Sequence, residues 1–347
     1  MLDELDEQDL ALINALQVAP RISWAQAAPV LGSTPATLAE RWERLRDEGI
    51  AWVTAHPRLQ DISLAFVDVD CAPGSRWEVI RELSLDPRVA SIEQSARGRD
   101  LLLTVMTPDL PTMTVFVLDD LPNVPGVQRS RTQVVKDVHR QGGDWRLGAL
   151  EPSQVAALKA AAAPAVPDAT VTLPPDPWPL IEAVTADGRR SAADIARLTG
   201  RNPATVRRQL ARLIASGALS FRCDVAQVKS HWPITCTWLA RVPMADHART
   251  AAVLATLPEI RMCMSITGDT NLMVGAWIRS LPDLLRLERV LGEKLPRLSL
   301  IESQITLRTV KRMGWMLDSQ GRSTGELVSP TALRPLSAAP LVLSGQA

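Results

Sequence analysis

The chain has 347 residues, 46% of them hydrophobic, which is enough for about two to four domains with packed cores. Its 38 basic and 38 acidic side chains give no net charge, so overall charge neither favours nor excludes nucleic acid. The four cysteines lack C-x-x-C spacing, which disfavours zinc or disulfides and favours buried free thiols. The acidic N-terminus and the lack of a long apolar run predict a soluble cytoplasmic protein without a membrane partner.

Three helices are predicted at the start of the chain. An apolar stripe over 10–18 predicts the first helix. Ser23, with Gln26 three residues later, is typical of a capping box at the start of the second. Thr34 followed by Pro35 predicts the start of the third, because an N-cap oxygen followed by proline is a strong helix-start signal.

The next segment changes from helical to strand periodicity. Ser75 and Glu78 indicate a capped helix within it. The expected strands are 63–69, 89–95, 101–106 and 127–138, and the second helix is 110–121. The order β-α-β-β-α-β is that of a ferredoxin-like domain, whose sheet has helices on one face and needs a cover on the other.

An Ala/Pro-rich linker follows over 141–177, with a short helix expected around 153–163. The pattern then recurs. Ser191 and Asn202-Pro203 start two helices, and the later elements are strands at 234–242, 260–267, 272–278 and 300–310 and helices at 246–257 and 282–295. The Ser/Pro/Ala-rich residues after about 322 are expected to be disordered.

The chain is therefore an internal repeat. Arg21, Gly32 and Gly49 recur as Arg189, Gly200 and Gly217 at a constant offset of 168 residues, with similar residues between them. The predicted fold class is α+β: two tandem copies of a helix-turn-helix domain followed by a ferredoxin-like domain, their two sheets pairing as an intramolecular pseudo-dimer.

The predicted domains are two helix-turn-helix units, two ferredoxin-like effector and dimerisation domains, a linker and a tail. We call the helix-turn-helix units the first and second heads. In chain order the boundaries are 1–55 (first head), 56–140, 141–177 (linker), 178–222 (second head), 223–318 and 319–347 (flexible tail).

This plan resembles the Lrp/AsnC (leucine-responsive/asparagine regulator) family of bacterial transcription regulators. The opening helix and turn over 9–23, the segment from Gly32 to Gly49, and the helix ends at 121–127 and 295–298 carry the resemblance. It implies ferredoxin-like (RAM/ACT-like) domains that pair and bind an amino acid or similar effector, with two heads on double-stranded DNA. It implies no cofactor or catalytic residue, and it implies self-association of pseudo-dimers.

Polar and basic residues at the start and outer face of each third helix are the candidate DNA contacts, because those positions meet bases and phosphates in a helix-turn-helix. They are Ser33, Thr34, Thr37, Arg41 and Arg44 in the first head, and Arg201, Asn202, Thr205, Arg207, Arg208 and Arg212 in the second.

The two heads differ in charge. Residues 1–55 have four arginines against nine acids, a net of −5, whereas residues 176–222 have eight arginines against four acids, a net of +4. Glu40 and Glu43 lie on the DNA-facing helix of the first head. The hypothesis is that the second head supplies most of the phosphate affinity on an asymmetric operator. The alternative is that the acids of residues 3–9 face solvent away from DNA.

A Gly-Asp turn between the central strands is the candidate effector site, since the family resemblance places the effector there. The candidate residues are Thr267, Gly268, Asp269, Thr270 and Asn271 in the second copy, and Gly98 and Arg99 in the first. Glycine admits a ligand carboxylate close to backbone N–H groups, and Asp269 is suited to an α-ammonium. The alternative is an ordinary hairpin turn.

Enzyme functions are less favoured. The four histidines are scattered without metal-ligand spacing, which is typical of surface or loop residues, and no metal site is expected. Sirohaem decarboxylases resemble the same two-domain plan, also occur as fused pairs, and use histidines and arginines around a tetrapyrrole; His231, in the connector, keeps that alternative open. A regulator that pairs with another regulator without binding DNA is a third possibility, consistent with the acidic first head.

Overall fold

The structure is a computed structural model that describes residues 5–57, 62–96, 98–162, 176–217 and 219–329. It divides into two compact units that do not follow chain order. The head unit contains the described parts of 1–61 and 146–225, and the sheet unit contains those of 62–145 and 226–334. Each unit therefore combines a segment from the first half of the chain with its counterpart from the second half.

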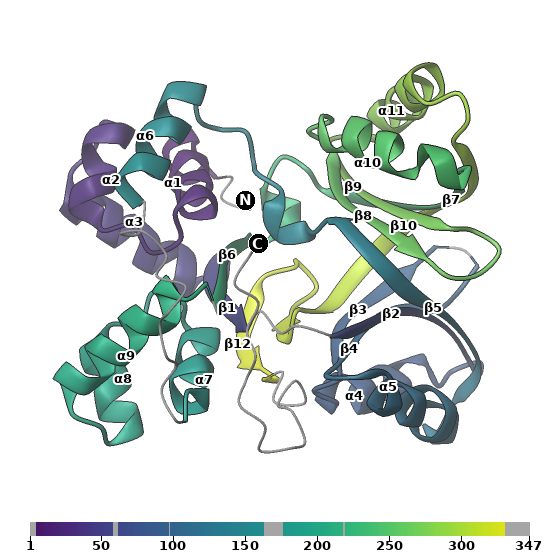
Figure 1. The fold of residues 1–347 in the computed structure, drawn as a ribbon, viewed down its shortest axis with the longest axis horizontal. Helices are drawn as coiled ribbons and strands as arrows, with labels where there is room; N and C mark the ends of the chain where they lie inside the picture. The colour runs from purple at the N-terminus through teal and green to yellow at the C-terminus, as the bar shows by residue number, and fades with distance from the viewer. Residues whose placement is uncertain (1–4, 58–61, 97, 163–175, 218, 330–347) are drawn as a thin grey trace. The chain divides into compact units, whose positions relative to one another are not determined.

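Each head has three helices, shown in Figure 1. The first head has α1 (Glu7–Val18), α2 (Trp24–Leu31) and α3 (Pro35–Asp47), and the second has α7 (Trp178–Ala186), α8 (Ala192–Thr199) and α9 (Pro203–Ala215). The predicted starts are confirmed, because Ser23 and Gln26 form a capping box and Thr34 accepts from the Thr37 N–H at 3.1 Å. Asn202 caps α9 by accepting from the Ala204 N–H at 2.9 Å.

The heads are joined by strands that the sequence did not predict. Antiparallel β1 (Ala51–Pro57) and β6 (Leu219–Val225) follow the third helix of each head and pair along their full length, with Ala51 opposite Val225. Such a ladder satisfies the backbone groups of two otherwise exposed edges.

Two arginines at repeat-equivalent positions link the heads in both directions. Arg189 of the second head donates to the Pro20 and Ile22 carbonyls at 2.7 and 2.9 Å. Arg21 of the first head donates to the Gly188 carbonyl and, at 3.3 Å, to that of Arg190. Burial lowers the pKa of Arg189 to about 10, with the nearby Arg21 charge contributing.

A pH-dependent loss of stability is expected at β1. Burial, followed by the Arg222 charge, lowers the pKa of His56 from 6.5 to about 4. The unfolded chain therefore binds a proton more readily than the folded chain, so the free energy of unfolding should fall as pH falls from about 6.5 to about 4. Urea denaturation at pH 7 and 4.5 measures this, and His56→Gln should reduce the difference. An unchanged difference in the variant would contradict this assignment.

Part of the predicted linker packs on the first head. The expected helix is α6 (Pro152–Ala162), and Gln154 Nε2 donates to the Val30 carbonyl at 3.0 Å. Two polar side chains of α1 accept from linker N–H groups: Gln17 from Leu147 and Asn14 from Ala149, both at 2.8 Å. Residues 146–162 are thus held to α1 and α2, and 163–175 lie outside the described residues.

The sheet unit has two β-α-β-β-α-β segments, as predicted. The first comprises β2 (Ser63–Cys71), α4 (Arg76–Leu85), β3 (Val89–Ser95), β4 (Leu101–Thr107), α5 (Leu110–Val115) and β5 (Val127–Arg140). The second comprises β7 (Ile234–Arg241), α10 (His247–Ala255), β8 (Ile260–Ile266), β9 (Leu272–Ile278), α11 (Leu281–Lys294) and β10 (Ser299–Arg312).

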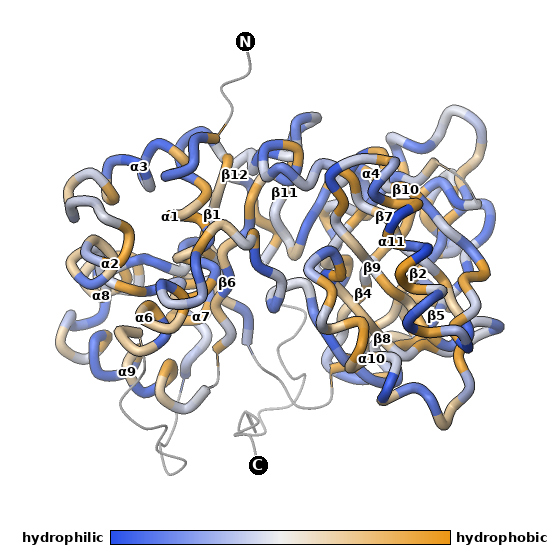
Figure 2. The backbone as a smooth tube through the Cα atoms, turned by 90° about the horizontal axis from the view of Figure 1, so that it is seen from above, coloured by the Kyte–Doolittle hydropathy of each residue, from blue (hydrophilic) through white to orange (hydrophobic). Residues whose placement is uncertain are grey.

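The strands of the two segments form one sheet through their edges. Its order is β12-β11-β10-β3-β4-β2-β5-β8-β9-β7, and an additional β10–β7 pairing closes a ring of eight strands. The helices lie on the outside of the strands in Figure 1. Side chains that point inward from both segments, including Phe66, Leu102, Leu239 and Met273, form a shared core. Hydrophobic stretches of these strands are orange in Figure 2.

Three local predictions need correction. The segment 319–329 is not simply a flexible tail, because β12 (Ser323–Leu327) pairs with β11 (Trp315–Leu317); the rest of the predicted tail lies outside the described residues. Ser75 makes no side-chain cap hydrogen bond to α4. The helix expected over 110–121 is α-helical only to Val115, with a π-helical turn over Phe116–Asp120.

The cysteines agree with the sequence prediction. All four are buried and free, and burial raises the pKa of both Cys71 and Cys236 to about 11. In the described part of the chain, no helix combines the length and apolarity needed to cross a membrane.

Candidate DNA-binding surface and effector site

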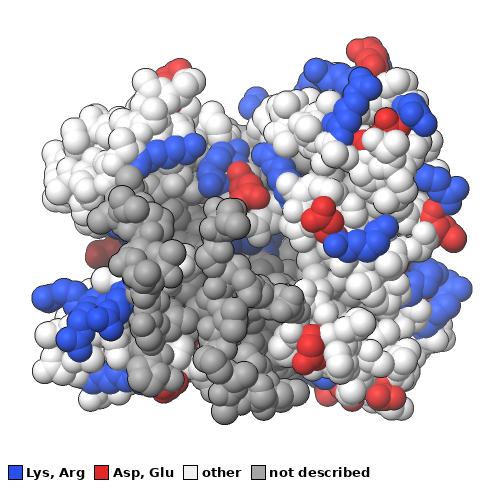
Figure 3. Space-filling model, viewed as in Figure 1, with Lys and Arg blue, Asp and Glu red and all other residues white. Residues whose placement is uncertain are grey.

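The outer face of α9 in the second head is basic. Arg207, Arg208 and Arg212 are exposed, and none has an ion-pair partner among the described residues. Arg201 differs, because its guanidinium lies 3.3 Å from an Asp176 carboxylate oxygen. Figure 3 shows Lys and Arg side chains gathered over the α8–α9 part of the molecule. Three cations of this helix are thus available to a polyanion.

The equivalent arginines of the first head are held by acids of the same head. Arg41 Nη1 lies 2.8 Å from Asp6 Oδ2 and 2.9 Å from Asp9 Oδ1. Arg44 Nη2 lies 2.7 Å from Asp9 Oδ1, and Arg44 also lies 3.8 Å from Glu48. The hydrogen bond to Asp6 is the main cause that raises the pKa of Arg41. Asp6 and Asp9 therefore face α3, and Glu40 and Glu43 are exposed on that helix.

The predicted polar contacts at the helix starts are similar in both heads. The Thr34 and Thr37 hydroxyls are 2.8 Å apart, and Ser33 is partly buried beside them. In the second head Asn202 is exposed and caps α9, while Thr205 is partly buried. The polar side chains at the start of the third helix form helix caps in both heads. The heads therefore differ at these helices mainly in charge.

The Gly-Asp turn of the second segment is partly engaged in holding the sheet. The Thr267 hydroxyl accepts from the Val134 N–H at 2.9 Å. The Asn271 side chain accepts from the Val242 N–H at 3.0 Å and donates to the Val242 carbonyl at 2.7 Å. Gly268 has φ +114, a conformation that favours glycine, and Asp269 is exposed, whereas Thr270 is buried. Asp269 is therefore exposed at the turn, and its side chain takes no part in the contacts that hold Thr267 and Asn271.

The turn of the first segment is built differently from the prediction. The guanidinium of Arg99 is 1% exposed and pairs with Asp68, whose side chain is 6% exposed, so it does not stand at the turn surface. A Cβ at Gly98 would lie 2.7 Å from a Glu302 oxygen, which leaves little room there. The buried Arg99 side chain is therefore not placed as an effector contact would require, whereas Gly98 is exposed.

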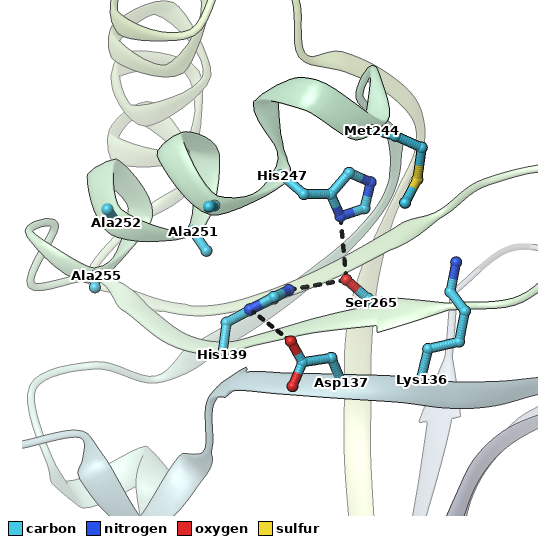
Figure 4. Close-up of a pocket in the computed structure, with 10 residues that line it drawn as sticks. Lys136, Asp137, His139, Met244, His247, Ala251, Ala252, Ala255 and Ser265 are labelled. Carbon is cyan, nitrogen blue, oxygen red and sulfur yellow. Dashed lines mark hydrogen bonds and ion pairs between the residues drawn. The ribbon is translucent and has the colours of Figure 1, made fainter.

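A pocket in the sheet unit was missed from the sequence. It is a cavity of about 640 Å³ between β5, β8 and α10, shown in Figure 4, and we call it the α10 pocket. The lining residues are Lys136, Asp137, His139, Met244, His247, Ala248, Ala251, Ala252, Ala255 and Ser265.

Two histidines that looked unrelated meet in this pocket. His139 Nε2 lies 2.8 Å and His247 Nδ1 3.1 Å from Ser265 Oγ, and His139 Nδ1 lies 3.4 Å from Asp137. The prediction of surface or loop histidines is therefore wrong for His139 on β5, His247 on α10 and His56 on β1. No sequence signal reveals the pair, because 126 residues separate His139 from Ser265 and only the β5–β8 pairing brings them together.

Family models match both halves of the chain. An AsnC-type helix-turn-helix domain matches residues 5–46, and a winged helix-turn-helix DNA-binding domain matches 180–219. The Lrp/AsnC ligand binding domain matches twice, over 64–144 and 239–316. The two ligand-domain matches fall on the two ferredoxin-like segments.

Several curated relatives are transcriptional regulators. The Bkd operon transcriptional regulator of Pseudomonas aeruginosa is 30% identical over 131 residues, which cover 36% of this chain and 86% of that protein. The HTH-type transcriptional regulator LrpC of Bacillus subtilis is 30% identical over 96 residues, covering 27% of this chain and 67% of the relative. An uncharacterized HTH-type transcriptional regulator of Pyrococcus horikoshii is 26% identical over 144 residues, covering 40% and 90%.

The siroheme decarboxylase NirDL has a similar fold over most of the chain. Its crystal structure covers 89% of this chain and 93% of its own, with a TM-score of 0.56 and 13% sequence identity. Identity this low indicates a shared fold alone. The paired helix-turn-helix and ligand-domain matches, together with relatives at 30% identity, show that the chain belongs to the Lrp/AsnC family of DNA-binding transcriptional regulators.

Proposed function

We propose that the chain is an intramolecular pseudo-dimer that regulates transcription from an asymmetric operator, with the second head supplying most of the phosphate affinity. The observation that carries this proposal is the contrast between the two reading helices. Arg207, Arg208 and Arg212 of α9 have no ion-pair partner among the described residues, whereas Arg41 and Arg44 of α3 are paired with Asp6 and Asp9.

The pairing affects affinity because binding to DNA exchanges condensed counterions for protein cations. An arginine that is already paired with a carboxylate must break that ion pair before it contacts a phosphate. It therefore contributes less binding free energy than an unpaired arginine does. The reciprocal Arg21 and Arg189 contacts and the β1–β6 ladder support a fixed relation between the heads, which suits two half-sites at one spacing. The test is footprinting with a salt titration, which should show strong protection of one half-site and weaker protection of the other. Equal protection would contradict the asymmetry.

Releasing the first-head arginines should strengthen DNA binding. Asp6→Asn with Asp9→Asn keeps side-chain size, and asparagine remains a good N-cap for α1. Arg41 and Arg44 then become available to phosphate, so affinity should rise and the slope of log K against log salt should steepen by about 2. A gel shift over a range of salt concentrations measures both. Glu7→Gln, on the same helix but outside these ion pairs, is the matched control and should change the slope by less than about 1.

We also propose that a small effector, such as an amino acid, acts through the sheet unit, and that pseudo-dimers associate further in the cytoplasm. Support comes from the ligand-binding-domain matches, which cover both ferredoxin-like segments. Isothermal titration with amino acids tests the first proposal, and light scattering with size exclusion tests the second.

A tetrapyrrole enzyme is a second candidate. The fold shared with NirDL and the meeting of His139 with His247 at one hydroxyl favour it. Among the ten lining residues of the α10 pocket, however, Lys136 is the only lysine or arginine, whereas a polycarboxylate such as sirohaem calls for several cations. His231 is exposed in a turn with φ 63 and lines no part of that pocket. Ultraviolet-visible titration with sirohaem separates the candidates, since a shifted Soret band would favour the enzyme.

A further inference from the structure

The α10 pocket lies in the second of two equivalent segments, and the side chains that line it differ from those of the first. Ile92 pairs with Lys311 and Cys263 with Arg140, so positions 171 residues apart are equivalent in the sheet unit. The same hydrogen bond occurs twice: Arg140 Nη1 donates to the Ala255 carbonyl at 2.8 Å, and Lys311 Nζ donates to the Ser84 carbonyl at 2.9 Å. The two sides can therefore be compared residue by residue.

Small side chains open the space on the α10 side. The wall of the pocket formed by α10 has Ala248, Ala251, Ala252 and Ala255. Their equivalents on α4 are Trp77, Ile80, Arg81 and Ser84, which are all larger or more polar. The Trp77 ring lies under the Arg308 guanidinium, 5.3 Å from its centroid, at the position equivalent to the pocket. The alanine wall is thus a specific feature of the second segment and does not arise from the fold alone.

The polar side of the pocket is fixed in position. Ser265 has one hydroxyl proton but lies within hydrogen-bond distance of two imidazoles, so at least one ring must donate its N–H to Ser265 Oγ. His247 is 8% exposed, and its Nε2 is buried with no hydrogen-bond partner among the described residues. A buried polar atom without a hydrogen-bond partner raises the free energy of the folded protein. A ligand that supplies the missing partner removes this cost.

One side chain at the edge of the pocket is suited to bind an anion. Lys136 is exposed at its edge in Figure 4 and has no ion-pair partner among the described residues, while Asp137 faces His139. The pKa of His247 is lowered by burial and then by the nearby charge of Lys136.

We propose that the α10 pocket binds a small aliphatic carboxylic acid, its carboxylate at Lys136 and its hydrocarbon chain along the alanine wall of α10. This inference rests on the proposed function, because it gives the effector a site other than the Gly-Asp turn. Amino acids and 2-oxo acids share this chemistry. Asp137 is exposed beside the pocket and suits an α-ammonium, so the two classes are separate arms of the test.

The test is isothermal titration of the full chain with leucine and with 4-methyl-2-oxopentanoate. Ala248→Trp places at this exposed position of the pocket wall the side chain that position 77 already has, so the fold should be retained while the bulky ring obstructs the pocket. It should abolish binding of whichever acid the wild type takes. Lys136→Gln should weaken binding roughly tenfold, since it removes a charged hydrogen bond.

Two variants serve as controls. Arg249→Gln removes an exposed charge from the same helix but does not line the pocket, so affinity should stay within about twofold. Asp269→Ala alters the turn and should likewise leave affinity unchanged. Binding of neither acid, unchanged binding in Ala248→Trp, or loss of binding in Asp269→Ala would overturn the proposal.

The failure of this proposal is distinguishable from failure of the DNA-binding proposal. Gel shifts on the same samples without acid report the heads alone. DNA binding without binding of either acid overturns the pocket and supports the regulator. Binding of an acid that Ala248→Trp abolishes supports the pocket even where no DNA is bound.

Discussion

Replacing Arg207 and Arg208 by alanine is expected to weaken DNA binding strongly at about 0.15 M salt. Both side chains are exposed on α9 and have no ion-pair partner among the described residues, so their removal should leave the head folded. The slope of log K against log salt should fall by about 2, and affinity by roughly 10- to 100-fold. Gel shifts across a salt series measure both quantities.

The matched control is Arg41→Ala with Arg44→Ala in the first head. Because these arginines are already paired with Asp6 and Asp9, the salt slope should change by less than about 1. Their loss should instead lower the melting temperature, since Asp9 is 3% exposed and would keep its charge without a partner. Equal losses of DNA affinity from the two double variants would overturn the proposed difference between the heads.

Replacing Arg99 by threonine should destabilise the sheet unit by up to about 3–5 kcal/mol, the usual cost of removing one partner of a buried ion pair, because Asp68 would keep only Arg131, which is 3.8 Å away and more exposed. Arg99 pairs with Asp68, and Gln133 Nε2 donates to the second Asp68 oxygen at 3.2 Å. Denaturation in urea measures the free energy of unfolding. This result would assign Arg99 to the interior of the sheet unit and away from effector binding.

The residues at the equivalent positions of the second segment indicate a second substitution that should restore stability. Positions 68 and 99 are equivalent to Leu239 and Thr270, both of which are buried there without a charge. Asp68→Leu combined with Arg99→Thr should therefore recover most of the loss, because replacing both partners avoids an unpaired charge. If the double variant is as unstable as Arg99→Thr alone, the ion pair contributes through something other than charge compensation.

Local sequence signals predicted the elements well where the responsible interaction is local. The Ser23–Gln26 box and the Thr34 and Asn202 caps are formed by residues two or three positions apart, so the sequence contains the whole interaction. Ser75 shows the limit of such patterns, because its capping sequence is present and the side-chain bond is not. Similarly, β1 and β6 were missed, since each is stabilised by a strand more than 160 residues away.

The candidate sites also differ in how much of each could be predicted from local sequence signals. The exposed arginines of α9 follow from helical periodicity and composition. The neutralisation of Arg41 and Arg44 depends on α1 packing beside α3, and the burial of Arg99 depends on Asp68 in a neighbouring strand. The α10 pocket depends on strand pairing between the two segments, which no spacing within one segment encodes.

The repeat, the two heads, the β-α-β-β-α-β order and the charge difference between the heads could all be predicted from local patterns, because periodicity, caps and composition are properties of neighbouring residues. Which charges are free, which are paired, and where a small molecule finds space became visible in the folded chain. Those outcomes depend on contacts between side chains far apart in the chain, and pairing or burial changes the free energy of a charge more than its position in the sequence does.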